Sequence, residues 1–113
     1  MKLSQMKRAA GNAAALLKSL SNPERLLILC CLAEGEISVG EIETHLKMRQ
    51  PRLSQQLARL RKDGLVTTRR NSRSIIYALG SASAESVITL LYDLYCAKPA
   101  QPKRSSSRRG ARN

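Results

Sequence analysis

The 113-residue sequence predicts one small, mainly α-helical domain that carries a single two-stranded β-hairpin. The chain has no Trp or Phe and only three Tyr, so Leu, Ile, Val and Ala must fill the core, and such cores are typical of packed helices. Apolar residues recur at helical spacing along most of the chain. Two β-prone runs, joined by a short polar turn, interrupt this pattern once.

Two helices are expected first. Residues 3–20 are rich in Ala, Leu and Lys, with Gly11 as a weak interruption, which predicts the first helix. The segment 21–24 then offers a helix cap, with Pro23 in the first turn of a very apolar second helix that continues to Leu32. We expect this second helix to form the centre of the core.

A helix-turn-helix unit is predicted next. Ser38 and Glu41 have the spacing of a capping box, which starts a third helix with a buried stripe of Val39, Ile42 and Leu46. After a turn at residues 47–49, a fourth helix is expected to begin at Gln50, with Pro51 near its first position. Its inward face is marked by leucines at i, i+4 and i+7: Leu53, Leu57 and Leu60.

A hairpin and a last helix complete the predicted domain. Residues 65–70 and 74–79 are β-prone runs around a short turn, so the fold class becomes a winged helix-turn-helix with a two-stranded wing. Residues 82–96 predict a helix with more apolar surface than one small domain needs: Val87, Leu90, Leu91, Leu94 and Tyr95. We therefore assign the first and last helices to a homodimer interface.

Basic charge is concentrated in two segments. The net charge of +12 is extreme for this length and indicates a polyanionic partner, with nucleic acid as the leading candidate. Residues 47–73 hold nine Lys and Arg against one acidic residue, and residues 97–113 hold six and none. The tail has Pro, Ser and Gly without apolar periodicity. We expect a folded domain over residues 1–97 and a disordered basic tail over residues 98–113.

A polar stripe on the fourth helix is the predicted reader of double-stranded DNA. Its members fall at i, i+3, i+4 and i+7 and are suited to guanine and adenine edges in the major groove: Arg52, Gln55, Gln56 and Arg59. Gln50 and Ser54 are expected to support them. The hairpin is expected to hold phosphates or enter the minor groove through Arg69, Arg70 and Arg73. A plain solvated surface is the alternative, but the adjoining turn and hairpin favour DNA, and a two-fold dimer predicts an inverted-repeat operator.

The sequence gives no support for several other function classes. No apolar run approaches the ~18 residues of a membrane span and no signal-peptide pattern is present, so we expect a cytoplasmic protein without a membrane partner. No catalytic triad, paired carboxylates or phosphate-binding loop are present, so an enzyme is not expected. Three cysteines without zinc-site spacing and a lone His45 predict neither a metal nor another cofactor.

Residues 10–96 resemble the ArsR-type repressors. The resemblance rests on five segments: LLKSLSNPERLLILC at 16–30, SVGEI at 38–42, QPRLSQQL at 50–57, LRKDGLV at 60–66 and LYDLYC at 91–96. It is greatest to the branch of biofilm growth-associated and sulfide-responsive repressors, which keep one Cys in the second helix and one at the end of the last. Here these are Cys30 and Cys96. The resemblance implies a homodimer that represses when reduced and leaves its operator when oxidant or reactive sulfur links the two thiols.

The sequence departs from the pattern of this family at two places. Metal-sensing members resemble this chain but carry a Cys-x-Cys pair where it has Ser38 and Gly40, which implies that metal sensing is lost. Cys31 is an additional thiol, and a helix turns ~100° per residue, so Cys30 and Cys31 face different partners. Three readings stay open: a thiol-switched repressor, a constitutive or architectural DNA binder with structural cysteines, and a protein-interaction module. The inducer, whether persulfide, peroxide or another oxidant, also stays open.

Overall fold

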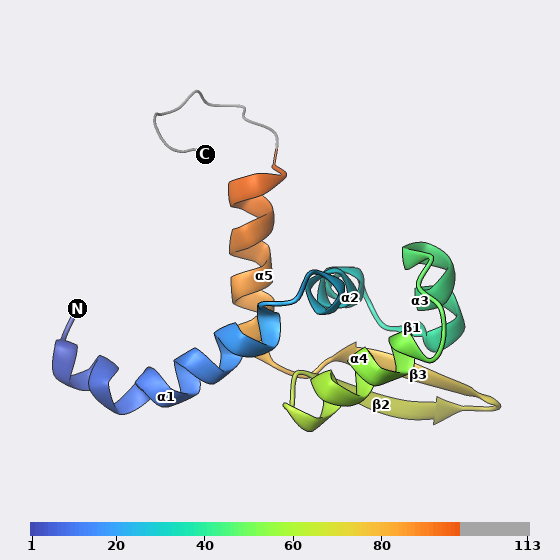
Figure 1. Ribbon diagram of the computed structural model, residues 1–113, viewed down its shortest axis with the longest axis horizontal. Coiled ribbons are helices and arrows are strands. Elements are labelled where there is room, and N and C mark those ends of the chain that lie inside the picture. The colour runs from blue at the N-terminus through green and yellow to red at the C-terminus, as the bar shows by residue number, and fades with distance from the viewer. Residues whose placement is uncertain (98–113) are drawn as a thin grey trace.

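The computed structural model describes residues 1–97, and the tail predicted over 98–113 lies outside the described residues. Five helices and three strands follow in the order α1 (Leu3–Leu20), α2 (Pro23–Ala33), β1 (Ile37–Ser38), α3 (Val39–Leu46), α4 (Arg52–Lys62), β2 (Val66–Asn71), β3 (Ser74–Leu79) and α5 (Ala82–Tyr95). In Figure 1, α2 lies in the centre, and α1, α5 and the β2–β3 hairpin project from it in three different directions. The predicted winged helix-turn-helix fold is confirmed.

The predicted starts of α2 and α3 are confirmed, and a side-chain cap fixes each of them. The side-chain oxygen of Asn22 accepts hydrogen bonds from the backbone N–H groups of Glu24 and Arg25, at 2.9 and 3.0 Å, and so opens α2. Ser38 and Glu41 form the expected reciprocal capping box at the start of α3. The start of α4 lies two residues later than predicted, at Arg52, because the backbone before it is not helical.

The sheet has one strand more than predicted. β3 lies between β2 and β1, and the two residues of β1 pair antiparallel with it, Ile37 opposite Tyr77. A two-residue strand beside a helix cap is too short to show an alternating pattern, and for this reason it was not predicted. The hairpin begins one residue later than predicted, at Val66, and turns at Ser72, which has a positive φ of 63°.

The core lies where α2, α3 and α4 meet the sheet and the first half of α5. Its fully buried large side chains come from these helices: Ile28, Leu29, Ile42, Leu53, Leu57 and Leu60. The predicted leucine face of α4 is therefore confirmed as core. On α5 the anchors are Ala84 and Ile88, whereas most of the predicted apolar stripe is exposed, with Leu90, Leu94 and Tyr95 at 54, 65 and 80%.

Candidate nucleic-acid interface and cysteine pair

The buried leucines of α4 fix which of its side chains face outward. Since consecutive residues of a helix are ~100° apart, the direction opposite the leucines is occupied by Gln55, Ala58 and Lys62, and all three are exposed. Of the predicted stripe, Arg52 and Gln55 are exposed, whereas Gln56 and Arg59 lie nearer the core and are half-buried. The stripe therefore spans two environments.

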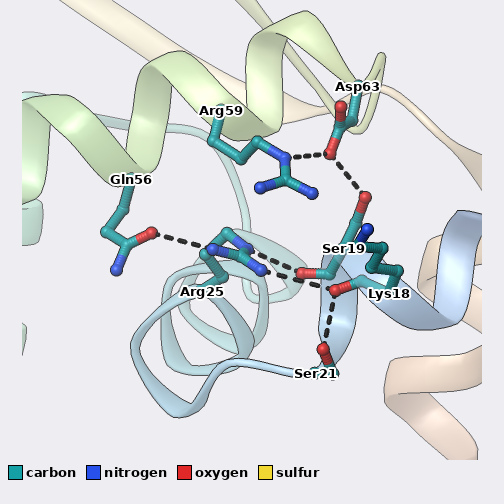
Figure 2. A network of polar contacts seen from close by, with 7 residues as sticks. All are labelled: Lys18, Ser19, Ser21, Arg25, Gln56, Arg59 and Asp63. Carbon is teal, nitrogen blue, oxygen red and sulfur yellow. Dashed lines mark hydrogen bonds and ion pairs between the residues drawn. The ribbon is translucent and has the colours of Figure 1, made fainter.

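Gln56 faces the N-terminus of α2. Its side-chain nitrogen donates to Glu24 Oε1 at 2.8 Å, and its side-chain oxygen accepts from Arg25 Nη1 at 3.2 Å. Figure 2 shows the Gln56 amide turned toward Arg25. Both ends of the amide are thus engaged within the protein.

Arg59 belongs to a second polar contact group on the same side of α4. Its Nε donates to Asp63 Oδ2 at 2.8 Å, and the same carboxylate accepts from Ser19 Oγ at the end of α1 (Figure 2). These contacts, the Ser19 hydrogen bond first, lower the pKa of Asp63. Arg25 completes the link by donating to the backbone oxygens of Ser19 and Lys18 at 2.7 and 3.4 Å. Figure 2 therefore shows one network that joins α1, α2 and α4.

The N-terminal end of α4 presents the remaining predicted readers. Arg52 Nε lies 3.2 Å from Glu24 Oε2, and the Arg52 side chain is 70% exposed. The Gln50 side-chain oxygen accepts hydrogen bonds from the backbone N–H and the hydroxyl of Ser54, and its nitrogen donates to Glu43. Gln50, Ser54 and Gln55 are all exposed. Four of the six predicted base-facing or supporting residues are thus exposed at the N-terminal end of α4.

A groove between α4 and the wing contains basic side chains that sequence reasoning missed. Its volume is about 520 Å³, and its walls come from α4, β3, the first residue of α3 and the segment just before α4, including Gln50, Ser54, Arg61, Lys62, Ile75 and Tyr77. Arg61 and Lys62 are exposed. The helical phase of Leu53, Leu57 and Leu60 contained the signal for Lys62, because it places this residue opposite the leucines, whereas it places Arg61 on a flank of α4.

The three predicted wing arginines differ in their contacts. Arg69 donates two hydrogen bonds to the Glu36 carboxylate, 3.1 Å from Nε and 3.0 Å from Nη2. This fork lowers the pKa of Glu36 and raises that of Arg69. Arg70 and Arg73 are exposed at the end of the hairpin. Arg69 is thus held by the protein, and Arg70 and Arg73 reach outward.

Cys30 and Cys96 lie on packed neighbours. Cys30 is half-buried in α2, and exposed Cys96 directly follows α5, which packs against α2. Burial raises the pKa of the Cys30 thiol, and negative charge on the nearby Cys96 raises it further. Burial also raises the pKa of Cys31, followed by the charges of Glu34, Cys30 and Glu41. All three thiols are free.

Residues 1–97 contain no candidate metal cluster and no candidate membrane span. No three His, Cys, Asp or Glu side chains in this part of the chain are grouped so that they could hold a metal ion. None of its helices has both the length and the apolar character needed to cross a membrane.

Comparisons with known proteins show the family to which this chain belongs. Residues 22–68 match the family described as bacterial regulatory protein, arsR family. The biofilm growth-associated repressor of Xylella fastidiosa strain 9a5c is 48% identical over 96 residues, which are 85% of this chain and 84% of that protein. The chain belongs to the arsR family. The family and branch predicted from the sequence are thereby confirmed.

Further arsR-family relatives agree with the fold. The transcriptional activator HlyU of Vibrio cholerae is 45% identical over 96 residues, 85% of this chain and 89% of that protein. The crystal structure of the transcriptional repressor BigR from Xylella fastidiosa superposes with a TM-score of 0.82 at 47% identity, over 87% of this chain and 100% of that one. In this arsR-family protein, α3 and α4 form the helix-turn-helix and β2 and β3 form the wing.

Proposed function

We propose that this arsR-family protein is a homodimeric, sequence-specific DNA-binding repressor of transcription that leaves its operator when Cys30 and Cys96 become linked. The observation that carries the proposal is the open surface of α4, flanked by a basic groove and an arginine-bearing wing. One similar protein is named a repressor and another an activator, and the thiol pair supports release of repression. Such a regulator acts on DNA in the cytoplasm.

Direct base contacts are proposed for Arg52 and Gln55, which are exposed and able to form paired hydrogen bonds with guanine and adenine edges. Gln50 and Ser54 support them from the same end of α4. Phosphate contacts are proposed for the wing and the groove: Arg69, Arg70, Arg73, Arg61 and Lys62. Base contacts by Gln56 and Arg59 stay predictions, and each requires the exchange of internal hydrogen bonds for DNA.

The proposed dimer interface uses the two helices that project from the core. α1 exposes Leu3, Met6 and Leu17, and α5 exposes Leu90, Leu94 and Tyr95. An exposed apolar surface of this extent is typical of a protein interface. A two-fold dimer places two copies of α4 on half-sites about 34 Å apart, so the expected operator is an inverted repeat.

The proposed switch begins at Cys96, the exposed thiol. With peroxide, the Cys96 thiolate attacks one oxygen and gives a sulfenic acid, while the other oxygen leaves as hydroxide; Cys30 then attacks the sulfenic sulfur, displaces its oxygen as water and forms the disulfide. Two thiols and one peroxide thereby give one disulfide and two waters. With a polysulfide of three or more sulfurs, two displacements release two hydrogen sulfides and leave at least one sulfur between the cysteines. A direct disulfide requires Cα atoms within about 7 Å, so a wider spacing favours the sulfur-containing bridge.

The proposed bridge reaches DNA through α2. The N-terminus of α2 contacts α4 through Glu24 and Arg25, and its later turns carry Cys30. Tying α2 to the end of α5, the proposed dimer helix, changes how the two copies of α4 are spaced. Because the half-sites are fixed in the DNA, a small change in spacing lowers affinity.

The test uses Cys30→Ser, Cys96→Ser and Cys31→Ser, with Cys31→Ser as the matched control. Operator affinity and intact mass are measured before and after peroxide or polysulfide, on the duplex that the reduced protein selects from random sequences. The wild type and Cys31→Ser should lose binding and regain it with reductant, whereas Cys30→Ser and Cys96→Ser should keep it. A full response from both Cys30→Ser and Cys96→Ser contradicts the switch. Loss of response in Cys31→Ser alone would assign the switch to Cys31 in place of Cys30.

A second candidate is a constitutive DNA binder whose cysteines are structural. It is favoured by the half-buried position and raised pKa of Cys30, which keep that sulfur mainly protonated. The same experiment separates the two functions, because a constitutive binder keeps operator affinity after every treatment.

A further inference from the structure

Glu24 contacts two side chains of the recognition helix α4 at once. Its Oε1 accepts a hydrogen bond of 2.8 Å from Gln56 Nε2, and its Oε2 lies 3.2 Å from Arg52 Nε. Arg52 and Gln56 are four residues apart and therefore neighbours on one face of α4. A single carboxylate on α2 thus holds the side of α4 that adjoins the proposed base-reading surface.

The backbone from which the Glu24 carboxylate extends is itself fixed. Glu24 lies in the first turn of α2, where its backbone N–H donates to the Asn22 cap. Gln56, its hydrogen-bond donor, is oriented in turn by Arg25, which donates to the other end of the amide at 3.2 Å. A reversed Gln56 amide would place its NH₂ group against the Arg25 guanidinium, so only one orientation satisfies both partners.

The ion pair joins Glu24 to Arg52 Nε, which leaves the two terminal nitrogens of the guanidinium for another acceptor. Paired terminal nitrogens are one half of the Arg contact with O6 and N7 of guanine. An exposed arginine has many rotamers, and holding it in one of them lowers the ordering cost of that contact. The Arg52 side chain is 70% exposed, so this restraint contributes little to folding.

We infer that Glu24 is a positioning residue for base recognition: it aims Arg52 at one base pair and thereby sets the specificity of the protein at that position. This inference rests on the proposed function of Arg52. Glu24 itself touches no base. Because its charge opposes DNA, its role is to improve discrimination while lowering affinity for every sequence.

The test compares Glu24→Gln with a matched control, Glu34→Gln, which removes the same charge at the exposed far end of α2. The probe is the duplex selected by the wild type from a random-sequence library, together with its single-base variants. Glutamine keeps an acceptor for Gln56 but loses the charge that holds Arg52. Glu24→Gln should lower discrimination about fivefold to tenfold at one base pair, the same one that Arg52→Ala affects. The remaining base pairs should be discriminated as before.

A simple electrostatic effect gives a different result. If Glu24 acts only by repelling DNA, Glu24→Gln and Glu34→Gln raise affinity for operator and random DNA together, and the base profile is unchanged; this outcome overturns the inference. Adding Glu24→Gln to Arg52→Ala should change discrimination no further, because the residue that Glu24 aims is gone. Thermal unfolding of each variant shows whether the fold is retained.

The failures of the inference and of the proposed function are distinguishable. If the library yields no preferred sequence, or if Arg52→Ala leaves the base profile intact, the proposed role of Arg52 is wrong. If Arg52→Ala alters discrimination at one base pair and Glu24→Gln leaves that base pair as it was, only the inference about Glu24 is wrong.

Discussion

The hydroxyl of Ser19 donates a 2.5 Å hydrogen bond to the carboxylate of Asp63, and so joins the buried end of α1 to the residue that follows α4. Ser19 is only 3% exposed, so its hydroxyl depends on this partner. Arg59 donates to the same carboxylate from within α4. One proposed dimer helix is thereby tied to the recognition helix without passing through the apolar core.

Removing the Asp63 charge should lower stability. Asp63→Asn should reduce the free energy of unfolding at neutral pH by about 1–2 kcal/mol, because it weakens hydrogen bonds from Ser19 and Arg59. The folded-state pKa of Asp63 is depressed, so this stabilisation is present above the unfolded pKa and is lost as the pH falls through the folded value. Denaturant unfolding against pH should therefore show the two proteins converging only at a pH below the ordinary pKa of an aspartate. Equal stability at neutral pH would count against the contact, and Glu34→Gln is the charge-matched control.

Much of the fold follows from local sequence, and much of the site does not. The caps at Asn22 and Ser38 and the leucine face of α4 rest on contacts between near neighbours, which sequence spacing records. Gln55 and Gln56 are the same residue type in adjacent positions. Their different environments depend on where α2 begins, 32 residues away from Gln56 in the contact with Glu24. The Arg69 fork depends likewise on Glu36, 33 residues distant.

The two glutamines should therefore behave differently. Gln55→Ala should leave stability unchanged and reduce discrimination at one base pair by about 1–3 kcal/mol, because Gln55 is exposed on the outward face. Gln56→Ala should lower the free energy of unfolding by about 1 kcal/mol, because it removes contacts to Glu24 and Arg25. Denaturant unfolding measures the stability of each variant, and binding to single-base variants of the duplex measures its base discrimination. The assignment fails if Gln56→Ala alters base preference more than Gln55→Ala does.

The wing should contribute affinity without sequence preference. Arg70→Ala should weaken binding to all duplexes alike and lower the slope of log affinity against log salt by about one per protomer, because one phosphate contact is lost. Arg69→Ala should lower that slope less, because Glu36 already neutralises its charge in the free protein. Binding titrations over a range of salt concentrations check this order, and a larger effect at Arg69 reverses the assignment.

Charge on the exposed face of α5 should separate the proposed dimer. Leu94 is 65% exposed within one protomer, so Leu94→Asp costs the isolated fold little but places an unpaired charge in the interface. Sedimentation should show monomers, with weaker operator binding. Leu91→Asp should act similarly but also lower stability, since Leu91 is half-buried. Thr89→Asp is the control and should remain dimeric, because exposed Thr89 lies at least ~100° around α5 from Leu90 and Leu94. A monomeric wild type that binds operator at full affinity would remove the dimer from the proposal.

The last prediction concerns the ionisation of the Cys30 thiol. Burial and the nearby Cys96 charge both raise the pKa of Cys30, so at neutral pH this sulfur is mainly the protonated thiol. In Cys31→Ser, the titration of Cys30, followed by ultraviolet thiolate absorbance and by the rate of iodoacetamide alkylation at each sulfur, should have its midpoint above that of an ordinary cysteine.

Removing Cys96 as well should move that midpoint down, because the repelling charge is gone, but not to the ordinary value, because burial remains the larger cause. Disulfide closure that is limited by attack of Cys30 should then accelerate with rising pH through this midpoint, while the first reaction at exposed Cys96 is already complete. An unchanged Cys30 midpoint in the double variant would mean that the two sulfurs are too far apart to interact. That result would contradict a direct disulfide between them.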